Sequence, residues 1–207
     1  MPSTKYPVNE TFYSLKGEGR WTGTPMFFIR LSGCNRNCDF CDTNHKPFEE
    51  RTVRDLLEEA RTYPTKRIVI TGGEPLIHNL EPLVETLSMA GYYLHLESNG
   101  DLQAKEHFFW KAVSPKDLDF DPMAVRAANE VKVLAGSPNW RVIASFVSVQ
   151  ASPSAYLYIM PLAKPFEQEQ RSPDDLIEEN ILEAITYCKQ HPKFSLCMQL
   201  HKLLRIK

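Results

Sequence analysis

Short runs of apolar and β-branched residues recur along the chain, separated by polar segments. Runs of this length, bounded by turn-forming residues, are typical of buried strands. The pattern predicts strands over residues 26–31, 67–70, 92–96, 111–113, 130–134, 156–159 and 195–198.

Helical patterns lie between several of these runs. The first predicted helix, which Thr52 can cap, has an apolar side made of Val53, Leu56, Leu57 and Ala60. The second, which ends before Gly91, has an apolar side made of Leu80, Leu83, Val84 and Leu87. A third is predicted to begin near Ser172, with Pro173 in its first turn and Asp175 at capping-box spacing. Its predicted apolar face consists of Leu176, Ile177, Ile181, Leu182 and Ile185.

Strands that alternate with helices favour a parallel α/β sheet. Residues 97–109 are too few and too polar for a packed helix between two of the strands. The chain has 207 residues, whereas a closed eightfold β/α barrel usually needs about 250. Since no repeat or Gly/Ser linker interrupts the chain, we expect one domain over residues 1–207 that forms an abbreviated, partial (β/α) barrel.

Charge and hydropathy exclude some classes of partner. The 24 Lys and Arg residues nearly balance the 26 Asp and Glu residues, so direct binding to nucleic acid is not indicated. No stretch approaches the roughly 18 consecutive apolar residues of a membrane span, and the first residues do not resemble a signal peptide. We therefore expect a cytoplasmic protein without membrane contact.

Nearly every predicted strand is followed at once by a polar or glycine-rich string. These strings are SGC, TGGEP, ESNG, SPK, MPL and QLHK. A strand-to-helix turn alone can account for any one of them. Because active-site groups of parallel α/β folds lie at the carboxyl ends of the strands, six such strings together predict a site on one rim.

The five cysteines are unevenly placed. Cys34, Cys38 and Cys41 fall within eight residues, whereas Cys188 and Cys197 stand far away in apolar surroundings. This is not the pattern of a disulfide framework. Three readings of the trio are open: inert buried thiols, a closed zinc site completed by His45, or an iron–sulfur cluster held by three thiolates with one iron open to a ligand. We favour the cluster.

Two motifs together carry a resemblance to a known superfamily. The spacing Cys34-x3-Cys38-x2-Cys41, with Phe40 before the third cysteine, resembles the [4Fe-4S] motif of radical S-adenosylmethionine (SAM) enzymes. TGGEP, about thirty residues downstream, resembles their glycine-rich strand end. Glycines let the backbone approach a ligand, and Glu74 offers an acceptor for an ammonium group. The resemblance implies a partial barrel of the radical SAM type.

A narrower resemblance extends over essentially the whole chain. The segments that carry it are NETFYSLKGEGRWTGTPMFFIRLSGCNRNCDFCDT, ITGGEPLIHNL, ESNG, SPK, NEVK and MQLHKLLRIK. They resemble the 7-carboxy-7-deazaguanine synthase family of the queuosine pathway. This implies a lyase that converts 6-carboxy-5,6,7,8-tetrahydropterin to 7-carboxy-7-deazaguanine with loss of ammonia. It also implies SAM, a [4Fe-4S] cluster and Mg²⁺ as cofactors, a homodimer, and an electron donor such as flavodoxin or ferredoxin.

The resemblance assigns roles residue by residue. The implied cluster ligands are Cys34, Cys38 and Cys41. The implied SAM-binding residues are Phe40, Asp42, Gly72, Gly73, Glu74, Gly100, Ser114, Pro115 and Lys116. The implied substrate-binding residues are Leu15, Lys16, Gly17, Glu18, Arg30, Ser98, His201 and Lys207. Thr43 matches the position whose hydroxyl ligates Mg²⁺, an ion that takes few protein ligands beside substrate oxygens and water.

Some of these residues have chemistry that fits the role. Arg30 is a guanidinium inside an otherwise apolar strand, which is costly to bury without a partner, and the pterin carries a carboxylate. Glu18 offers the acceptor that an aminopyrimidine edge requires. The alternatives are a protein ion pair for Arg30, a surface carboxylate for Glu18 and a hydrogen-bonded core histidine for His201.

The chain departs from the family pattern at two positions. Lys16 stands where many relatives have Gln, and Lys207 ends the chain where relatives commonly have a small residue or proline. Both departures bear on how the substrate is held.

Two other functions are compatible with the cysteine spacing. One is an activating enzyme that generates a glycyl radical on a protein partner, which would need an open face for a polypeptide. The other is a zinc-stabilised module without catalysis.

Overall fold

The computed structural model describes residues 4–164 and 176–207. Within these ranges the strands are β1 (Lys5–Leu15), β2 (Pro25–Leu31), β3 (Glu49–Thr52), β4 (Arg67–Gly72), β5 (Tyr93–Ser98), β6 (Trp110–Val113), β7 (Glu130–Ala135), β8 (Tyr156–Pro161) and β9 (Phe194–Leu196). The α-helices are α1 (Val53–Ala60), α2 (Glu81–Met89), α3 (Pro122–Arg126), α4 (Trp140–Gln150), α5 (Glu178–Gln190) and α6 (Leu200–Leu204). Two 3₁₀ turns are η1 (Gly19–Trp21) and η2 (Pro75–Ile77).

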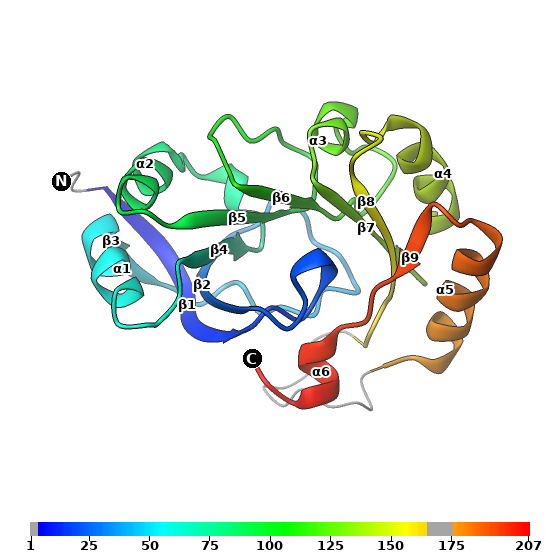
Figure 1. The fold of residues 1–207 in the computed structure, drawn as a ribbon, viewed down its shortest axis with the longest axis horizontal. Coiled ribbons are helices and arrows are strands. Elements are labelled where there is room, and N and C mark those ends of the chain that lie inside the picture. Colours follow the sequence, from blue (N-terminus) through cyan, green and yellow to red (C-terminus); the bar gives the residue numbers. More distant parts are fainter. Residues whose placement is uncertain (1–3, 165–175) are drawn as a thin grey trace.

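The strands form one curved sheet in the order β3-β1-β2-β4-β5-β6-β7-β8-β9. From β2 to β9 every neighbouring pair is parallel, and only β1 runs antiparallel to its neighbours β2 and β3. Helices α1 to α5 lie along the outer side of the curve, whereas η1 and α6 lie at its open side (Figure 1). The predicted α/β partial barrel is confirmed.

Alternate residues of each parallel strand face opposite sides of the sheet. Ile68 and Ile70 of β4 pack against the core beneath α1 and α2, and Val131 and Val133 of β7 pack in the core beneath α4 and α5. The residues between them point to the concave side. On β7 this places Lys132, which is 1% exposed, among polar groups rather than in the apolar core.

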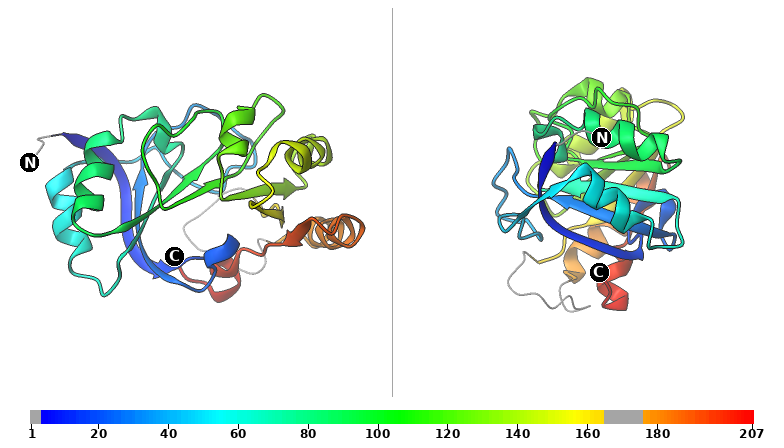
Figure 2. Two further views of the ribbon diagram at one scale, coloured as in Figure 1. Left: turned by 45° about the horizontal axis from the view of Figure 1, so that its top comes forward. Right: turned by 90° about the vertical axis from the view of Figure 1, so that its left-hand side faces the viewer.

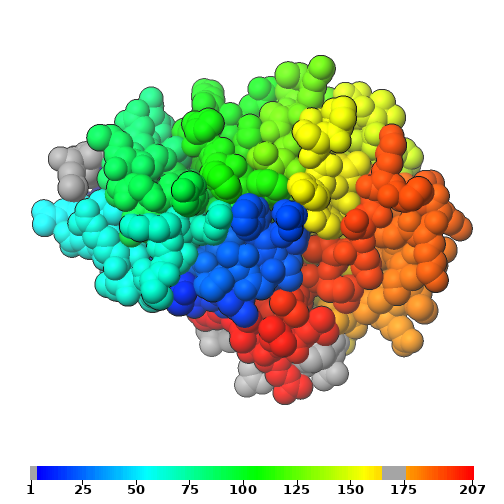
Figure 3. All heavy atoms as spheres, viewed as in Figure 1, coloured from blue at the N-terminus to red at the C-terminus, as the bar shows by residue number. Residues whose placement is uncertain are grey.

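The C-terminal segment meets the end of β1 and the β1–β2 loop on the concave side. Leu200 N donates to Gly17 O at 2.9 Å, and Ser14 Oγ donates to Lys207 O at 2.6 Å. Gly19 N, at the start of η1, donates to Cys197 Sγ at 3.1 Å. The segment with η1 and the segment with α6 lie on the same side of the sheet (Figure 2), and the β1–β2 connection adjoins the C-terminal segment at the molecular surface (Figure 3). The C-terminal segment therefore completes the wall that β1 begins.

All seven predicted strands are present, with ends displaced by no more than two residues. The helices predicted after Thr52 and before Gly91 are confirmed as α1 and α2, and Thr52 and Asp55 form a capping box. Residues 99–109 contain no helix, as expected. The pattern missed β1, which contains Pro7 and is largely half-buried, and α4, whose apolar residues lie on several sides of the helix.

The third predicted helix is confirmed from Glu178 onward, whereas Leu176 and Ile177, expected on its apolar face, precede it. Its expected start, Ser172 to Asp175, lies outside the described residues, and α5 begins only at Glu178. Leu176 forms an isolated bridge with Ala163, and Ile177 precedes the helix. Leu182 is 57% exposed, because the helix packs through Ala184 and Tyr187 on the β7–β9 side.

A cluster of rings and one guanidinium closes the barrel at the amino ends of its strands. The Arg67 guanidinium lies 4.1 Å from the centroid of the Trp21 ring and 3.1 Å from His95 Nε2. Phe109 and Tyr93 complete the cluster. Burial and the positive charge of Arg67 lower the pKa of His95 to about 4. The imidazole is therefore neutral at pH 7 and accepts a hydrogen bond from Arg67.

No helix among residues 4–164 and 176–207 is long and apolar enough to span a membrane.

The depressed pKa of His95 predicts an acid-dependent loss of stability. An unfolded histidine takes up a proton below pH 6.5, whereas folded His95 does so only near pH 4, so the free energy of unfolding falls as the pH drops between these values. From the size of the interval, the loss is on the order of 3 kcal/mol. His95→Gln should remove this component. Urea unfolding of both proteins between pH 7 and pH 4.5 measures it, and an identical pH dependence would contradict the prediction.

Candidate active site

The strings that follow the strands gather around one pocket at the carboxyl ends of the strands. Its lining includes Cys34, Gly72, Gly73, Ser98, Asn99, Ser114, Lys116, Met160, Pro161, Leu162, Gln199 and His201. Each of the six strings thus contributes at least one residue. The predicted convergence on one rim is confirmed, and parallel pairing of the strands is its cause.

The cysteine loop lies over this rim. Cys34, Cys38 and Cys41 all line the pocket, and a turn in which Cys41 N donates to Cys38 O at 3.0 Å orders the segment between the last two. Burial raises the pKa of the Cys34 and Cys38 thiols. A bound cation would offset this effect, because it stabilises the thiolate form.

Side chains from two neighbouring loops hold the cysteine loop in place. Asn35 Nδ2 donates to Asp101 Oδ2 at 2.8 Å and Arg36 Nη2 donates to Asp101 Oδ1 at 2.7 Å. Asp119 also accepts from Arg36, and Asn99 Nδ2 donates to Asn35 Oδ1 at 2.8 Å. These contacts join the loop to the segments that follow β5 and β6.

Among the described residues, no three His, Cys, Asp or Glu side chains are close enough together to hold one metal ion. A closed zinc site of Cys34, Cys38, Cys41 and His45 would require such a group. Three thiols that line one pocket are compatible with a polynuclear cluster, in which each thiolate binds a different iron.

The two glycines of TGGEP lie so close to neighbouring backbone atoms that a side chain at either position would clash. A Cβ at Gly73 would lie 2.3 Å from Gly33 O and 2.7 Å from Cys34 Cβ, and one at Gly72 would lie 2.4 Å from Leu31 O. The loop after β4 therefore packs directly on the loop that carries Cys34. This leaves both glycine backbones at the pocket wall.

Glu74 is placed differently from expectation. It is fully buried and does not line the pocket. Its carboxylate accepts from Asn99 N at 2.6 Å, Leu76 N at 3.0 Å and Ser98 Oγ at 3.1 Å, and burial raises its pKa. The side chain therefore joins the loops after β4 and β5, behind the lining of the pocket. Gly100, with φ of +84°, and the buried Pro115 also lie outside the lining.

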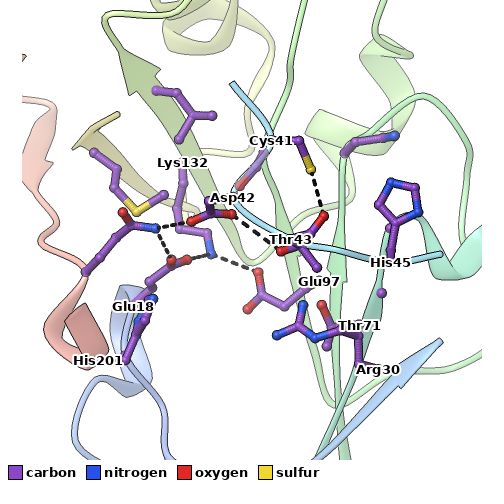
Figure 4. Close-up of a pocket in the computed structure, with 18 of the residues that line it drawn as sticks. Glu18, Arg30, Cys41, Asp42, Thr43, His45, Thr71, Glu97, Lys132 and His201 are labelled. Atoms are coloured by element: carbon purple, nitrogen blue, oxygen red, sulfur yellow. Dashed lines mark hydrogen bonds and ion pairs between the residues drawn. The ribbon is translucent and has the colours of Figure 1, made fainter. Parts of the chain in front are cut away.

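A buried set of charges also lines the pocket (Figure 4). Lys132 Nζ lies 2.7 Å from Glu18 Oε2 and 2.8 Å from Glu97 Oε2, and Lys16 Nζ lies 2.8 Å from Glu97 Oε1. Burial alone would raise the pKa of both carboxyl groups, but the lysines outweigh it and lower the pKa of Glu97 and, further, that of Glu18. Both carboxylates are ionised at neutral pH.

The loop that carries Glu18 is packed closely between His201 and Glu130. A Cβ at Gly17 would lie 2.1 Å from His201 Nδ1, and a Cβ at Gly19 would lie 2.1 Å from Glu130 Oε1. Arg20 N donates to Glu130 Oε2 at 2.9 Å. The GEG string thus places Glu18 between the C-terminal segment and β7.

Arg30 and Lys207 share one carboxylate at the pocket edge. Arg30 Nε lies 3.0 Å from Glu10 Oε1, and Lys207 Nζ lies 2.8 Å from Glu10 Oε2. Burial alone would raise the pKa of Glu10, but Lys207 and Arg30 lower it. The alternative of a protein ion pair for Arg30 is therefore realised. Both cations still line the pocket.

The structure brings together most of the predicted site. Leu15, Lys16, Gly17, Glu18, Phe40, Asp42, Thr43 and Ser98 line the pocket with the residues already named, and of the predicted set only Glu74, Gly100 and Pro115 do not. The sequence prediction missed Glu97, Lys132 and Gln199. Glu97 and Lys132 are charged residues at alternate positions of apolar strands, the same signal that singled out Arg30.

Comparisons with known proteins agree with this geometry. Residues 28–109 match the model of the radical SAM superfamily. A 7-carboxy-7-deazaguanine synthase of Synechocystis sp. is 36% identical over 99% of this chain and 95% of its own. One of Bacteroides thetaiotaomicron is 32% identical over 97% and 98%. The crystal structure of QueE from Escherichia coli superposes with a TM-score of 0.77 at 27% identity and covers 95% of each chain.

The packing of the GEG loop predicts unequal effects of two glycine substitutions. Gly19 and Gly23 have φ of +72° and +82°, but only Gly19 is close to other atoms. Gly23→Ala should cost about 1–2 kcal/mol of backbone strain. Gly19→Ala should cost a further 1–3 kcal/mol or so, because its Cβ must displace Glu130. Chemical unfolding of both variants measures the difference, and equal losses would contradict the packing.

Proposed function

The chain belongs to the 7-carboxy-7-deazaguanine synthase family of radical SAM enzymes, and we propose that its pocket converts 6-carboxy-5,6,7,8-tetrahydropterin to 7-carboxy-7-deazaguanine with loss of ammonia. It is a radical SAM lyase of the queuosine pathway. The observation that carries the substrate assignment is one pocket lined both by three thiols and by Glu18, Glu97 and Arg30. We call the part with the thiols the cofactor end and the part with the charged residues the substrate end, because they suit a redox cofactor and a small polar substrate that carries a carboxylate.

The cofactor end is built from the cysteine loop and the strand ends. We assign Cys34, Cys38 and Cys41 to a [4Fe-4S] cluster, and Phe40, Asp42, Gly72, Gly73, Glu74, Gly100, Ser114, Pro115 and Lys116 to SAM. When bound, these cofactors supply one-electron chemistry that no side chain provides. The protein side chains position the reactants and exclude water. Lys116 supplies a cation beside Asp42 and Cys38, and burial lowers its pKa.

The substrate end is built from the β1–β2 loop, β2, β5 and the C-terminal segment. We assign Leu15, Lys16, Gly17, Glu18, Arg30, Ser98, His201 and Lys207 to the pterin. Ionised Glu18 accepts from ring N–H groups, and Arg30 attracts the carboxylate. Because Glu10 already pairs with both Arg30 and Lys207, the substrate carboxylate competes with or displaces it.

Further assignments complete the proposal. Thr43 is the proposed Mg²⁺ ligand, together with substrate oxygens and water. Residues 1–207 act as one domain, in a homodimer that receives electrons from a flavodoxin or ferredoxin. We place the protein in the reducing cytoplasm, where the three half-buried thiols of the cysteine loop stay available as ligands.

The two alternative functions have less support. An activating enzyme needs a face for a polypeptide, whereas this pocket is covered by the C-terminal segment through Gly17 and Ser14. A zinc module needs four ligands around one ion, and the thiols and His45 are not gathered in that way.

Anaerobic incubation of the reconstituted protein with reductant, SAM and 6-carboxytetrahydropterin tests the function. Mass spectrometry should detect 7-carboxy-7-deazaguanine together with 5′-deoxyadenosine. Cys38→Ala should abolish both products and the brown absorbance, whereas Cys188→Ala, on the far side of the sheet in α5, should retain them. Formation of 5′-deoxyadenosine alone by the wild-type protein would reject the substrate, and retention of both products by Cys38→Ala would reject the cluster.

The contacts of Asp101 predict an effect on cluster retention. Asp101→Asn replaces the charged partner of Arg36 and loosens the cysteine loop, so the reconstituted variant should lose iron faster during anaerobic gel filtration. Asp117→Asn changes an exposed carboxylate nearby and serves as the control. The ratio of iron to protein and the visible absorbance measure the effect. Equal iron content in the two variants and the wild-type protein would show that the contact between Asp101 and Arg36 is not needed to retain the cluster.

A further inference from the structure

The best-buried charge in the pocket belongs to Lys132, a residue to which the family resemblance assigned no role. Its side chain is 1% exposed, and it projects from the middle of β7 to the concave side of the sheet. Burying an ammonium is costly unless it is paired and hydrogen-bonded. Burial alone would lower the pKa of Lys132, but Glu18 and Glu97 outweigh it and raise that pKa well above the ordinary value. Lys132 is therefore a permanent cation.

Lys132 joins two carboxylates that come from distant parts of the chain. Glu18 lies in the β1–β2 loop and Glu97 in β5, and both line the pocket. Each uses one oxygen for Lys132, at 2.7 Å and 2.8 Å. The other oxygen of Glu97 binds Lys16, and that of Glu18 accepts from Gln199 Nε2 at 3.0 Å. Every carboxylate oxygen thus has one fixed partner.

The same contacts leave acceptor capacity for a ligand. An ionised carboxylate has about four lone-pair positions. The contacts to Lys132, Lys16 and Gln199 use two on each carboxylate, so both Glu18 and Glu97 retain positions for donors from the pocket. A substrate with several N–H groups on one edge matches two such carboxylates held side by side.

Without Lys132, the carboxylates of Glu18 and Glu97 would repel each other. Two carboxylates on one ammonium are close to each other, and like charges at this distance favour uptake of a proton by one of them. A protonated carboxyl presents an O–H donor, which would meet the N–H donors of the substrate. Lys132 prevents this by keeping both groups ionised and in fixed positions.

We propose that Lys132 is the positioning residue of the substrate end, which holds Glu18 and Glu97 as a pair of ionised acceptors for the N–H edge of the pterin. This rests on the proposed function, since the pterin supplies the donors. The carboxylates contact the substrate, and Lys132 acts through them. Gln199 extends the same chain of contacts to Asp42 at 3.4 Å, and Lys202 Nζ pairs with Asp42 at 2.8 Å, so the substrate end is linked to the cysteine loop.

The test compares ligand affinities in anaerobically reconstituted protein. Lys132→Met should weaken binding of 6-carboxytetrahydropterin by roughly 30-fold or more, as expected when one partner of a buried charge pair is removed. Binding of SAM should change by less than about threefold, since a loss of this size corresponds to under 1 kcal/mol. SAM should then be cleaved to 5′-deoxyadenosine without matching product. Lys16→Gln is the matched variant, because it removes a lysine from Glu97 but leaves the bridge to Glu18, and it should weaken pterin binding less.

A double variant keeps the test decisive if Lys132→Met folds poorly. Lys132→Met/Glu97→Gln removes one negative charge together with the ammonium and should recover thermal stability, but pterin binding should stay weak because one acceptor is lost. Equal losses of pterin and SAM affinity in the folded variants would show that Lys132 is only structural. Unchanged pterin affinity would overturn the proposal. If the wild-type protein itself does not bind or convert the pterin, the proposed function fails instead.

Discussion

The pairing of buried charges on the concave side of the sheet is the constraint on which the pocket depends. Lys132 lies on the concave side of β7 with almost no exposure, and it is tolerated there only because Glu18 and Glu97 reach it. Glu18 reaches it because Gly17 and Gly19 let the β1–β2 loop fit between His201 and Glu130. One ammonium therefore fixes the relative positions of a loop, two strands and the C-terminal segment.

The two ends of the pocket are built by different means. The cofactor end uses backbone proximity, with Gly72 and Gly73 packed on the cysteine loop and Arg36 tied to Asp101. The substrate end uses ion pairs whose partners are far apart in sequence. Glu74 belongs to the first system, because its carboxylate accepts three protein hydrogen bonds that hold the loops after β4 and β5 together. Close backbone packing and long-range ion pairs thus support different parts of one pocket.

The aromatic cluster at the opposite ends of the strands serves the barrel rather than the site. Trp21, from the same β1–β2 connection that carries Glu18, stacks on Arg67 and touches His95. The β1–β2 connection is therefore held at the amino ends of the strands by the rings around Trp21, and near the pocket by His201, which packs on Gly17. These two contacts hold Glu18, which directly precedes the 3₁₀ turn η1, at the pocket wall.

The sequence by itself determined the strands, the parallel arrangement, the cysteine loop and the rim at the strand ends. These follow from local signals: apolar periodicity, capping residues such as Thr52, and the spacing of Cys34, Cys38 and Cys41. Tertiary structure alone decided which of these side chains line the pocket and which pair within the protein. Glu74 joins two loops, Arg30 pairs with Glu10, and Lys132 pairs with Glu18, because the partners of a buried charge come from distant segments; Lys132 and Glu18 are 114 residues apart. Local pattern shows that a charge in an apolar strand needs a partner, but only the folded chain shows which partner satisfies it.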